Sequence, residues 1–239
     1  MDLEYNNKIY VYSPNSNTVC TTVQGVRKNM LDDYYIYNDK NYTLYVVVDG
    51  HGPDGEYVIR YIKNYTQYFK KSIENNINNI DLITKNILMD IEQLNNNLLI
   101  EYNKNKFING GSTLLMLIIL DTKLLFINIG DTRAYYFTYV DKNFLDLYKT
   151  PVHRNGYKNS QVIGDFHIKN NLKPHFEVIN KIPYSYVFIT TDGLWEYFNP
   201  FPLDEKKCEN NNLGYDLVKT AIDNGSKDNI LVLIIRIGV

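Results

Sequence analysis

The sequence predicts an α+β fold in which a central antiparallel β-sandwich is flanked by α-helices. Short runs of β-branched and aromatic residues, separated by turn residues, lie in both halves of the chain, and two long amphipathic segments lie between them. No repeat, linker or shift in composition divides the 239 residues. A chain of this length can bury a sizeable core, so we expect one domain over residues 1–239.

Two strand pairs open the chain. Residues 9–12 and 18–24 flank the turn-forming run Ser13-Pro14-Asn15-Ser16-Asn17, which predicts a hairpin. Residues 34–37 and 44–48 form a second pair around residues 38–41. Because residues 44–48 are apolar throughout, we expect them to form a buried strand.

Two amphipathic helices follow, at residues 56–71 and 81–102, where apolar residues recur at three- and four-residue spacing. The apolar stripe of the second helix comprises Leu82, Ile83, Ile87, Ile91, Leu94 and Leu98.

Strands then return at residues 113–120, 123–129 and 133–140, and again at 186–191 and 230–237. A helix at residues 213–222, ending at Gly225, separates the last two. This order of strands, two helices, strands, helix and strand is typical of an antiparallel sandwich covered by helices.

Composition excludes several classes of protein. The net charge of −2 gives no excess of positive charge that would attract nucleic acid or an anionic membrane. The longest apolar runs, such as 114–120, are too short to span a bilayer. The acidic start Met1-Asp2-Leu3-Glu4 lacks an apolar signal segment, and Cys20 and Cys208 indicate reduced thiols. We therefore expect a cytoplasmic or nuclear protein that is not secreted.

Acidic residues stand at the ends of the predicted strands. Asp49, Asp131 and Asp192 each follow an apolar run, and Asp228 precedes the last strand. In an antiparallel sandwich such positions share one rim, so we expect the carboxylates to converge. Clustered carboxylates repel one another, and a divalent cation relieves that repulsion. An oxygen-only donor set favours Mg²⁺ or Mn²⁺ over zinc.

Neighbouring residues suit hydrolysis of a phosphate ester. Two cations close together support in-line displacement at phosphorus. Gly50 has no side chain, so its carbonyl can approach an ion closely. His51 is of the type that protonates a leaving alcohol, and the guanidinium of Arg27 matches phosphate geometry.

Structural explanations stay open for each of these residues. Asp49 could cap a turn, and Asp131 could pair with Arg133 or cap its own turn. His51 could be a turn histidine, and Arg27 could form a surface ion pair of little energetic value. Two sets of residues are assigned no site at this stage. Asp165 is interpreted as a structural cap or hydrogen-bond acceptor, and three histidines are interpreted as surface residues: His153, His167 and His175.

Six motifs carry a family resemblance. Residues 25–32 (GVRKNMLD) and 47–52 (VVDGHG) are followed by residues 110–113, 130–134, 191–196 and 226–230. In this order, and over nearly the whole chain, they resemble the signatures of the type 2C metal-dependent Ser/Thr protein phosphatases, the PPM family. The resemblance implies a four-layer α/β/β/α fold and two bound Mn²⁺ or Mg²⁺ ions, with a weaker third.

The resemblance also implies the metal ligands. Asp49 is expected to bridge two ions, with the Gly50 carbonyl bound to one of them. Asp192 and Asp228 are expected to complete the other ion's site. Asp131 is expected to contribute, with Asp192, to the third position.

The remaining implied roles concern water, phosphate and the leaving group. Asp32 is expected to hold metal-bound water, Arg27 to bind the substrate phosphate, and His51 to act as general acid.

The chain departs from the family in two places. Leu31 stands where the family usually has Glu, so we expect weaker or altered metal binding at one site. Residues 150–154 resemble the start of the family's flap and residues 159–166 resemble the segment that follows it, but the insertion between them is almost absent. Gln161 also replaces a usual Arg. A reduced flap predicts a more open cleft, fewer substrate contacts, or a partner that supplies them.

These observations predict an enzyme that hydrolyses phosphoserine and phosphothreonine in proteins. Leu31 and the reduced flap motivate an alternative, a catalytically inactive phosphatase-like binding module or decoy. A nuclease or other phosphodiesterase is disfavoured because the chain lacks a basic stripe for a nucleic-acid backbone. We expect phosphorylated protein substrates, no nucleic-acid or membrane partner, and a monomer.

Overall fold

The computed structural model describes residues 8–155, 158–159, 161–167, 172–203, 205–208 and 212–238. The acidic start of the chain and Ser160 therefore lie outside the described residues. The chain divides into two compact units. The first comprises Met1–Asp32, Thr132–Pro151 and Asn180–Val239, and the second comprises Asp33–Asp131 and Val152–Ile179.

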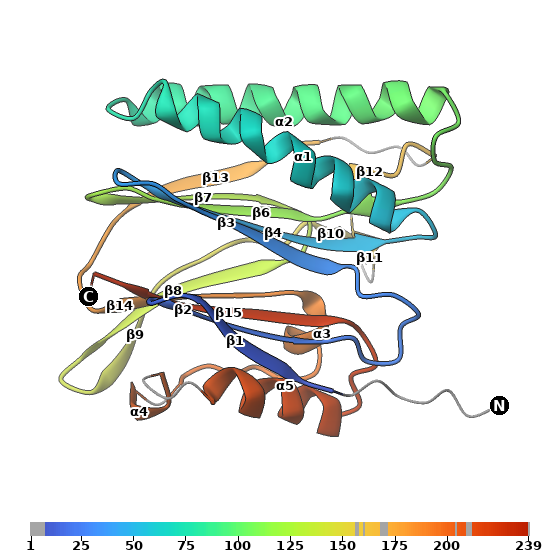
Figure 1. Cartoon of the computed structure of the whole chain (residues 1–239). Coiled ribbons are helices and arrows are strands. Elements are labelled where there is room, and N and C mark those ends of the chain that lie inside the picture. The colour runs from blue at the N-terminus through green and yellow to red at the C-terminus, as the bar shows by residue number, and fades with distance from the viewer. Residues whose placement is uncertain are drawn as a thin grey trace. The chain divides into compact units, whose positions relative to one another are not determined.

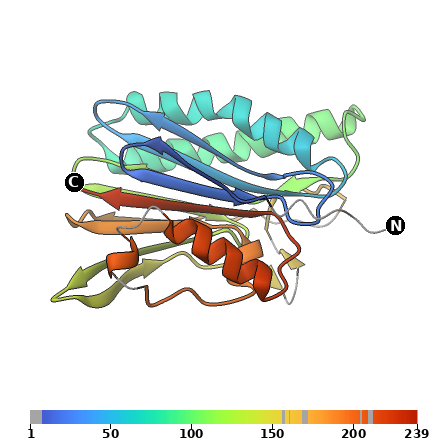
Figure 2. The same cartoon turned by 60° about the horizontal axis from the view of Figure 1, so that its bottom comes forward.

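The first unit contains a six-stranded antiparallel sheet. Its strands, in spatial order, are β1 (Tyr10–Asn15), β2 (Thr18–Val23), β15 (Ile230–Ile237), β14 (Ser185–Thr190), β8 (Arg133–Val140) and β9 (Asn143–Lys149). Helix α5 (Leu213–Asp223) packs on β2 and β15 (Figures 1 and 2). Val218 and Ala221 of α5 share one buried apolar cluster with Val232 of β15. Two further helices, α3 (Asp192–Trp195) and α4 (Glu205–Cys208), are short.

The second unit contains a seven-stranded sheet. Its spatial order is β12 (Ile163–Gly164), β5 (Gly111–Ser112), β4 (Thr43–His51), β6 (Leu114–Ile119), β7 (Lys123–Ile129) and β13 (His175–Asn180), with β3 (Asp32–Asn38) paired to β4. Helices α1 (Gly55–Glu74) and α2 (Ile80–Asn103) pack against each other, and α1 packs on β4 (Figure 1). Asn79 starts α2 by accepting the N–H of Leu82 at 3.1 Å.

Most predicted elements are confirmed, and the α+β class with antiparallel sheets flanked by helices is confirmed with them. β8 and β15 have the predicted bounds, and α1 and α2 extend the predicted helices by a few residues. The predicted stripe of α2 is wrong at Leu82, whose side chain is 42% exposed, whereas Ile83 is buried. The buried face of α2 includes Ile83 and Thr84, and Leu82 lies about 100° from Ile83 on the other side, toward solvent.

The end of β4 differs from the prediction. The apolar run predicts a strand that stops at Val48, but β4 continues through Asp49, Gly50 and His51. It continues because Gly50 pairs with Ser112 and His51 pairs with Gly111 of β5. The candidate functional residues are therefore held within a strand and not in a loop after it.

Two edge strands, β9 and β13, are not predicted from the sequence. Their side chains are mostly exposed or half-buried, so they carry no apolar pattern. In the region of the expected flap, the described residues form β10 (Arg154–Asn155) and β11 (Lys158–Asn159), which pair as a sheet of two-residue strands. In the part of the chain that the structure describes, no helix combines the length and apolar character needed to cross a membrane.

Candidate active site

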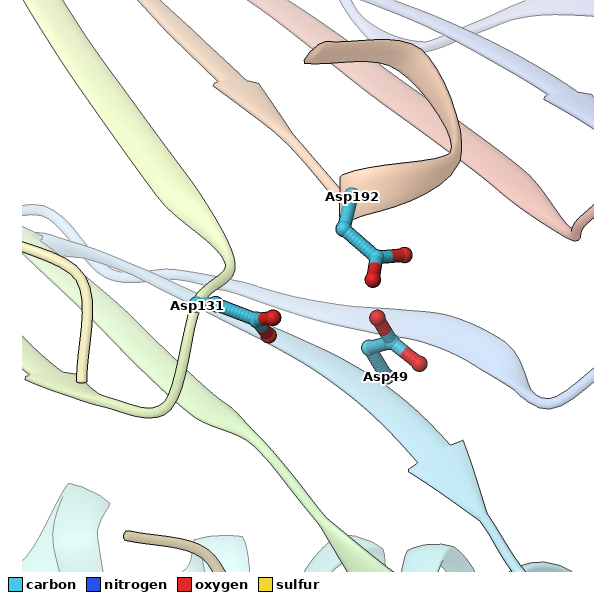
Figure 3. A group of neighbouring side chains, drawn as sticks. All are labelled: Asp49, Asp131 and Asp192. Carbon is cyan, nitrogen blue, oxygen red and sulfur yellow. The ribbon is translucent and has the colours of Figure 1, made fainter. Parts of the chain in front are cut away.

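Asp49 and Asp131 lie close together in the second unit. The N–H of Asp49 donates to Thr113 Oγ1 at 3.0 Å, and the N–H of Thr113 donates to the Asp49 carbonyl at 2.9 Å. This double link holds the end of β4 beside the start of β6. One carboxylate oxygen of Asp49 lies within 4.8 Å of one of Asp131, which follows β7 (Figure 3).

The turn that carries Asp131 is fixed from the other side by residues 153 and 154. The N–H of Gly130 donates to His153 Nδ1 at 3.1 Å, and the N–H of His153 donates to the Gly130 carbonyl at 2.9 Å. Arg154 Nε forms an ion pair with Asp131 Oδ2. Asp131 is completely buried, so the guanidinium of Arg154 compensates a negative charge that water cannot reach.

His153 is therefore not the surface residue that the sequence analysis expects. Burial lowers the pKa of His153, the positive charge of His175 lowers that pKa further, and Asp131 opposes both effects. A neutral ring is the form that accepts the N–H of Gly130 at Nδ1. His153 and Arg154 both belong to the segment that resembles the start of the flap, which is the signal that could have identified them.

The ion-pair partner of Asp131 is Arg154 and not Arg133. Arg133, two residues away, does not take that role in the described structure. Its guanidinium lies over the ring of Trp195, 3.5 Å from the centroid. Its Nη1 also donates to the Tyr135 hydroxyl at 3.4 Å. The cation–π contact stabilises the guanidinium without a carboxylate.

His51 has a carboxylate partner that the sequence analysis did not assign. His51 Nε2 lies 2.7 Å from Asp165 Oδ2. The His51 side chain is 37% exposed and that of Asp165 is 10% exposed, so the ring is accessible and its partner is buried. The two residues are 114 positions apart in the sequence, so local sequence patterns do not reveal the pair.

In the first unit, Arg27 forms an ion pair with Asp228, and both side chains are partly exposed. The loop that carries Arg27 is clamped to the start of β15 by Asn229. Asn229 Oδ1 accepts the N–H of Leu31 at 2.7 Å, and its Nδ2 donates to the Gln24 carbonyl at 2.7 Å. Leu31, the residue that departs from the family pattern, therefore still contributes its backbone to this clamp.

Asp192 and Asp32 are linked through Thr191. Asp192 is the first residue of α3 (Figure 3). Thr191 Oγ1 donates to Asp32 Oδ2 at 2.7 Å and accepts the N–H of Leu231 at 3.0 Å. Asp32 is buried, so this hydroxyl holds its carboxylate in one position. A side chain on Gly193 would lie 2.1 Å from the Asn229 carbonyl oxygen, which requires glycine after Asp192.

No family model matches this chain, and no curated protein matches it. Solved structures do match. The serine/threonine phosphatase Stp1 from Staphylococcus aureus is 21% identical with a TM-score of 0.73, over 93% of this chain and 95% of that chain. The S. agalactiae serine/threonine phosphatase is 19% identical with a TM-score of 0.72, over 97% and 99%. The Mycobacterium tuberculosis phosphatase PstP/Ppp is 15% identical with a TM-score of 0.69, over 93% and 98%.

This chain has the fold of the bacterial serine/threonine phosphatases. The resemblance derived from the ordered motifs is thereby confirmed at the level of the fold. The phosphatase fold also places the motif residues in context. VVDGHG covers the end of β4 and the following Gly52, GDTRA spans the turn from β7 into β8, and TDGLWE covers α3 with one residue on either side.

The residues of this phosphatase fold suit a hard divalent cation. Asp49 and Asp131 offer carboxylate oxygens within 4.8 Å of each other, which is close enough for strong mutual repulsion and for shared coordination. Arg154 offsets part of the negative charge of Asp131. Gly50 pairs with Ser112 within the sheet, so its backbone is held beside Asp49.

Proposed function

We propose that this chain is a metal-dependent protein-serine/threonine phosphatase of the type 2C family, with residues 1–239 forming a single catalytic domain. The observation that carries the proposal is the close pair of carboxylates, Asp49 and Asp131, at the strand ends of a serine/threonine phosphatase fold. The order of the six motifs along the chain supports it.

The proposed metal ligands are carboxylates and one carbonyl at the strand and helix ends, namely Asp49, Gly50, Asp131, Asp192, Asp228 and Asp32. We propose that they hold two Mn²⁺ or Mg²⁺ ions and a weaker third. When bound, the ions supply Lewis acidity, which makes water nucleophilic at neutral pH and neutralises charge on the phosphoryl oxygens.

The side chains of the protein perform the other steps. Arg27 binds the phosphate of the substrate. Its guanidinium has five donors, and the ion pair between its Nη2 and Asp228 leaves others available for non-bridging oxygens. His51 donates a proton to the serine or threonine oxygen as the ester bond breaks, because an unprotonated alkoxide is a poor leaving group.

The proposed substrates are phosphorylated proteins. The two-residue strands β10 and β11 supply little of a flap, so we propose that a substrate protein makes few contacts there. The buried cysteines Cys20 and Cys208 fit an intracellular, reducing compartment, and we propose that the protein acts as a monomer.

The proposal is tested by turnover of a phosphoserine peptide in the presence of Mn²⁺. We expect turnover that EDTA abolishes and that Asp49→Ala and Asp192→Asn reduce by several orders of magnitude. Asp121→Asn, in the exposed turn between β6 and β7, is the matched control and should retain full activity. Turnover that persists in EDTA would contradict the metal mechanism.

A second candidate function is a binding module that lacks catalysis. It is favoured by one observation, namely that Arg27 and Arg154 form ion pairs with two of the proposed ligands, Asp228 and Asp131. Titration calorimetry with Mn²⁺ separates the two candidates. A folded protein that binds no Mn²⁺ and turns over no phosphopeptide is the module, whereas Mn²⁺ binding with turnover supports the enzyme.

A further inference from the structure

Asp165 is a buried carboxylate that the proposed mechanism does not use. Its Oδ2 lies 2.7 Å from His51 Nε2, and its Oδ1 is buried with no hydrogen-bond partner among the described residues. Burying an ionisable group with one oxygen unsatisfied costs free energy. A chain that needed only a turn at this position could avoid that cost with a smaller residue.

The backbone is built to bring Asp165 to His51. Asp165 follows β12 and adopts φ +53°, a left-handed conformation that is uncommon outside glycine. β12 pairs with β5 through Gly164 and Gly111, and β5 pairs with β4 through Gly111 and His51. The N–H of Asp165 also donates to the Gly110 carbonyl at 3.0 Å. Three adjacent strands therefore fix both partners.

The space between the two side chains is provided by Gly111. A Cβ at this position would lie 2.7 Å from His51 Nε2 and 2.9 Å from Asp165 Cγ. Neither contact is tolerable for a side chain, so the hydrogen bond between His51 and Asp165 requires glycine in the strand between them.

We propose that Asp165 is a positioning residue that holds the His51 ring in one orientation and one tautomer. The carboxylate accepts a hydrogen bond from Nε2–H, so a second proton on the ring lies on Nδ1, for which the described residues supply no hydrogen-bond partner. In the doubly protonated ring, Nδ1 faces the leaving oxygen and passes its proton to it, while Nε2–H stays bound to Asp165. This inference rests on the proposed phosphatase activity.

Two substrates with different leaving groups test the inference. A phosphoserine peptide releases a basic alkoxide and needs a proton donor, whereas p-nitrophenyl phosphate releases a stable phenolate and does not. Asp165→Asn should lower kcat for the peptide roughly 10–100-fold, while KM, Mn²⁺ affinity and p-nitrophenyl phosphate turnover change little. In a His51→Gln background the same substitution should have no further effect on the peptide.

Asp54→Asn is the matched control. The Asp54 carboxylate accepts the N–H groups of Ile108 and Asn109, just before the Gly110-Gly111 segment. Its loss should lower stability without changing the ratio of the two activities. If Asp165→Asn does not fold, Gly111→Ala provides the second variant, because it separates His51 from Asp165 while keeping both groups and should lower the same ratio.

Equal losses of both activities in Asp165→Asn would overturn the inference, as would an undiminished effect in the His51→Gln background. Long-range ¹H–¹⁵N spectra of His51 give a readout independent of activity. A single tautomer protonated at Nε2 in the wild type that becomes a mixture in Asp165→Asn supports positioning, and a mixture in the wild type refutes it. Absence of any turnover by the wild type contradicts the proposed function, and the spectra then decide the positioning role alone.

Discussion

Replacing Arg154 by alanine tests the buried ion pair that supports the candidate site. Asp131 is 0% exposed and the Arg154 side chain is 16% exposed, so the pair is largely removed from water. Removing one partner of such a pair leaves an uncompensated buried charge, which costs about 3–5 kcal/mol. For a chain of 239 residues, each kcal/mol lowers Tm by about 2–4 °C. We therefore expect Arg154→Ala to lower Tm by roughly 6–20 °C in EDTA.

Thermal unfolding followed by circular dichroism in EDTA measures this change. Arg60→Ala is the matched control, because Arg60 pairs with Glu56 on the exposed face of α1 at 3.6 Å. Such a pair contributes only about 0.3–0.5 kcal/mol. Mn²⁺ should stabilise Arg154→Ala more than the wild type, since a cation near Asp131 replaces the lost charge. A Tm loss no greater than that of Arg60→Ala would refute the buried pair.

Three further predictions concern the core, the Asp32 link and pH. Ile87→Ala should cost about 2–5 kcal/mol in urea denaturation because Ile87 is fully buried, whereas Leu82→Ala should cost under about 1 kcal/mol, and equal costs would contradict the α2 packing. Thr191→Val leaves the Asp32 carboxylate without its 2.7 Å hydrogen bond, so it should cost about 1–3 kcal/mol and weaken Mn²⁺ binding by calorimetry, with unchanged values arguing against the link. Burial lowers the pKa of His153 below its ordinary 6.5, so the unfolded chain binds a proton first. In EDTA, the contribution of His153 to the free energy of unfolding should be fully present above about pH 6.5 and be lost as the pH drops through the folded pKa. His153→Gln should reduce this pH dependence of stability.

The sequence predicts the fold class well because the strands and helices that form the cores carry strong apolar patterns. The run before Asp49 and the stripe of α2 are examples, and only Leu82 was assigned to the wrong face. Edge strands β9 and β13 lack such patterns because few of their side chains are buried. The extension of β4 to His51 was missed for a different reason, since it depends on pairing with β5.

The sequence predicts individual candidate residues of the site but not which residues they contact. The sequence identified Asp49, Asp131 and His51 as candidates, and it offered Arg133 as a neighbour for Asp131 because the two are close in the chain. The structure pairs Asp131 with Arg154 and His51 with Asp165 instead. Strand pairing through β5 brings Asp165 to His51, and the hydrogen bonds between His153 and Gly130 bring Arg154 to Asp131. Local spacing encodes neither contact.

The segment from His153 to Gly164 is held at both ends, and this has a consequence for how the protein can vary. His153 fastens one end of the intervening segment to Gly130, and Gly164 fastens the other end to Gly111. Residues between Arg154 and Gln161 can be deleted or inserted without shifting His51 or Asp131, because loop length costs little once the ends are fixed. The region of the expected flap is therefore a place where longer loops can be grafted while the proposed catalytic groups keep their positions.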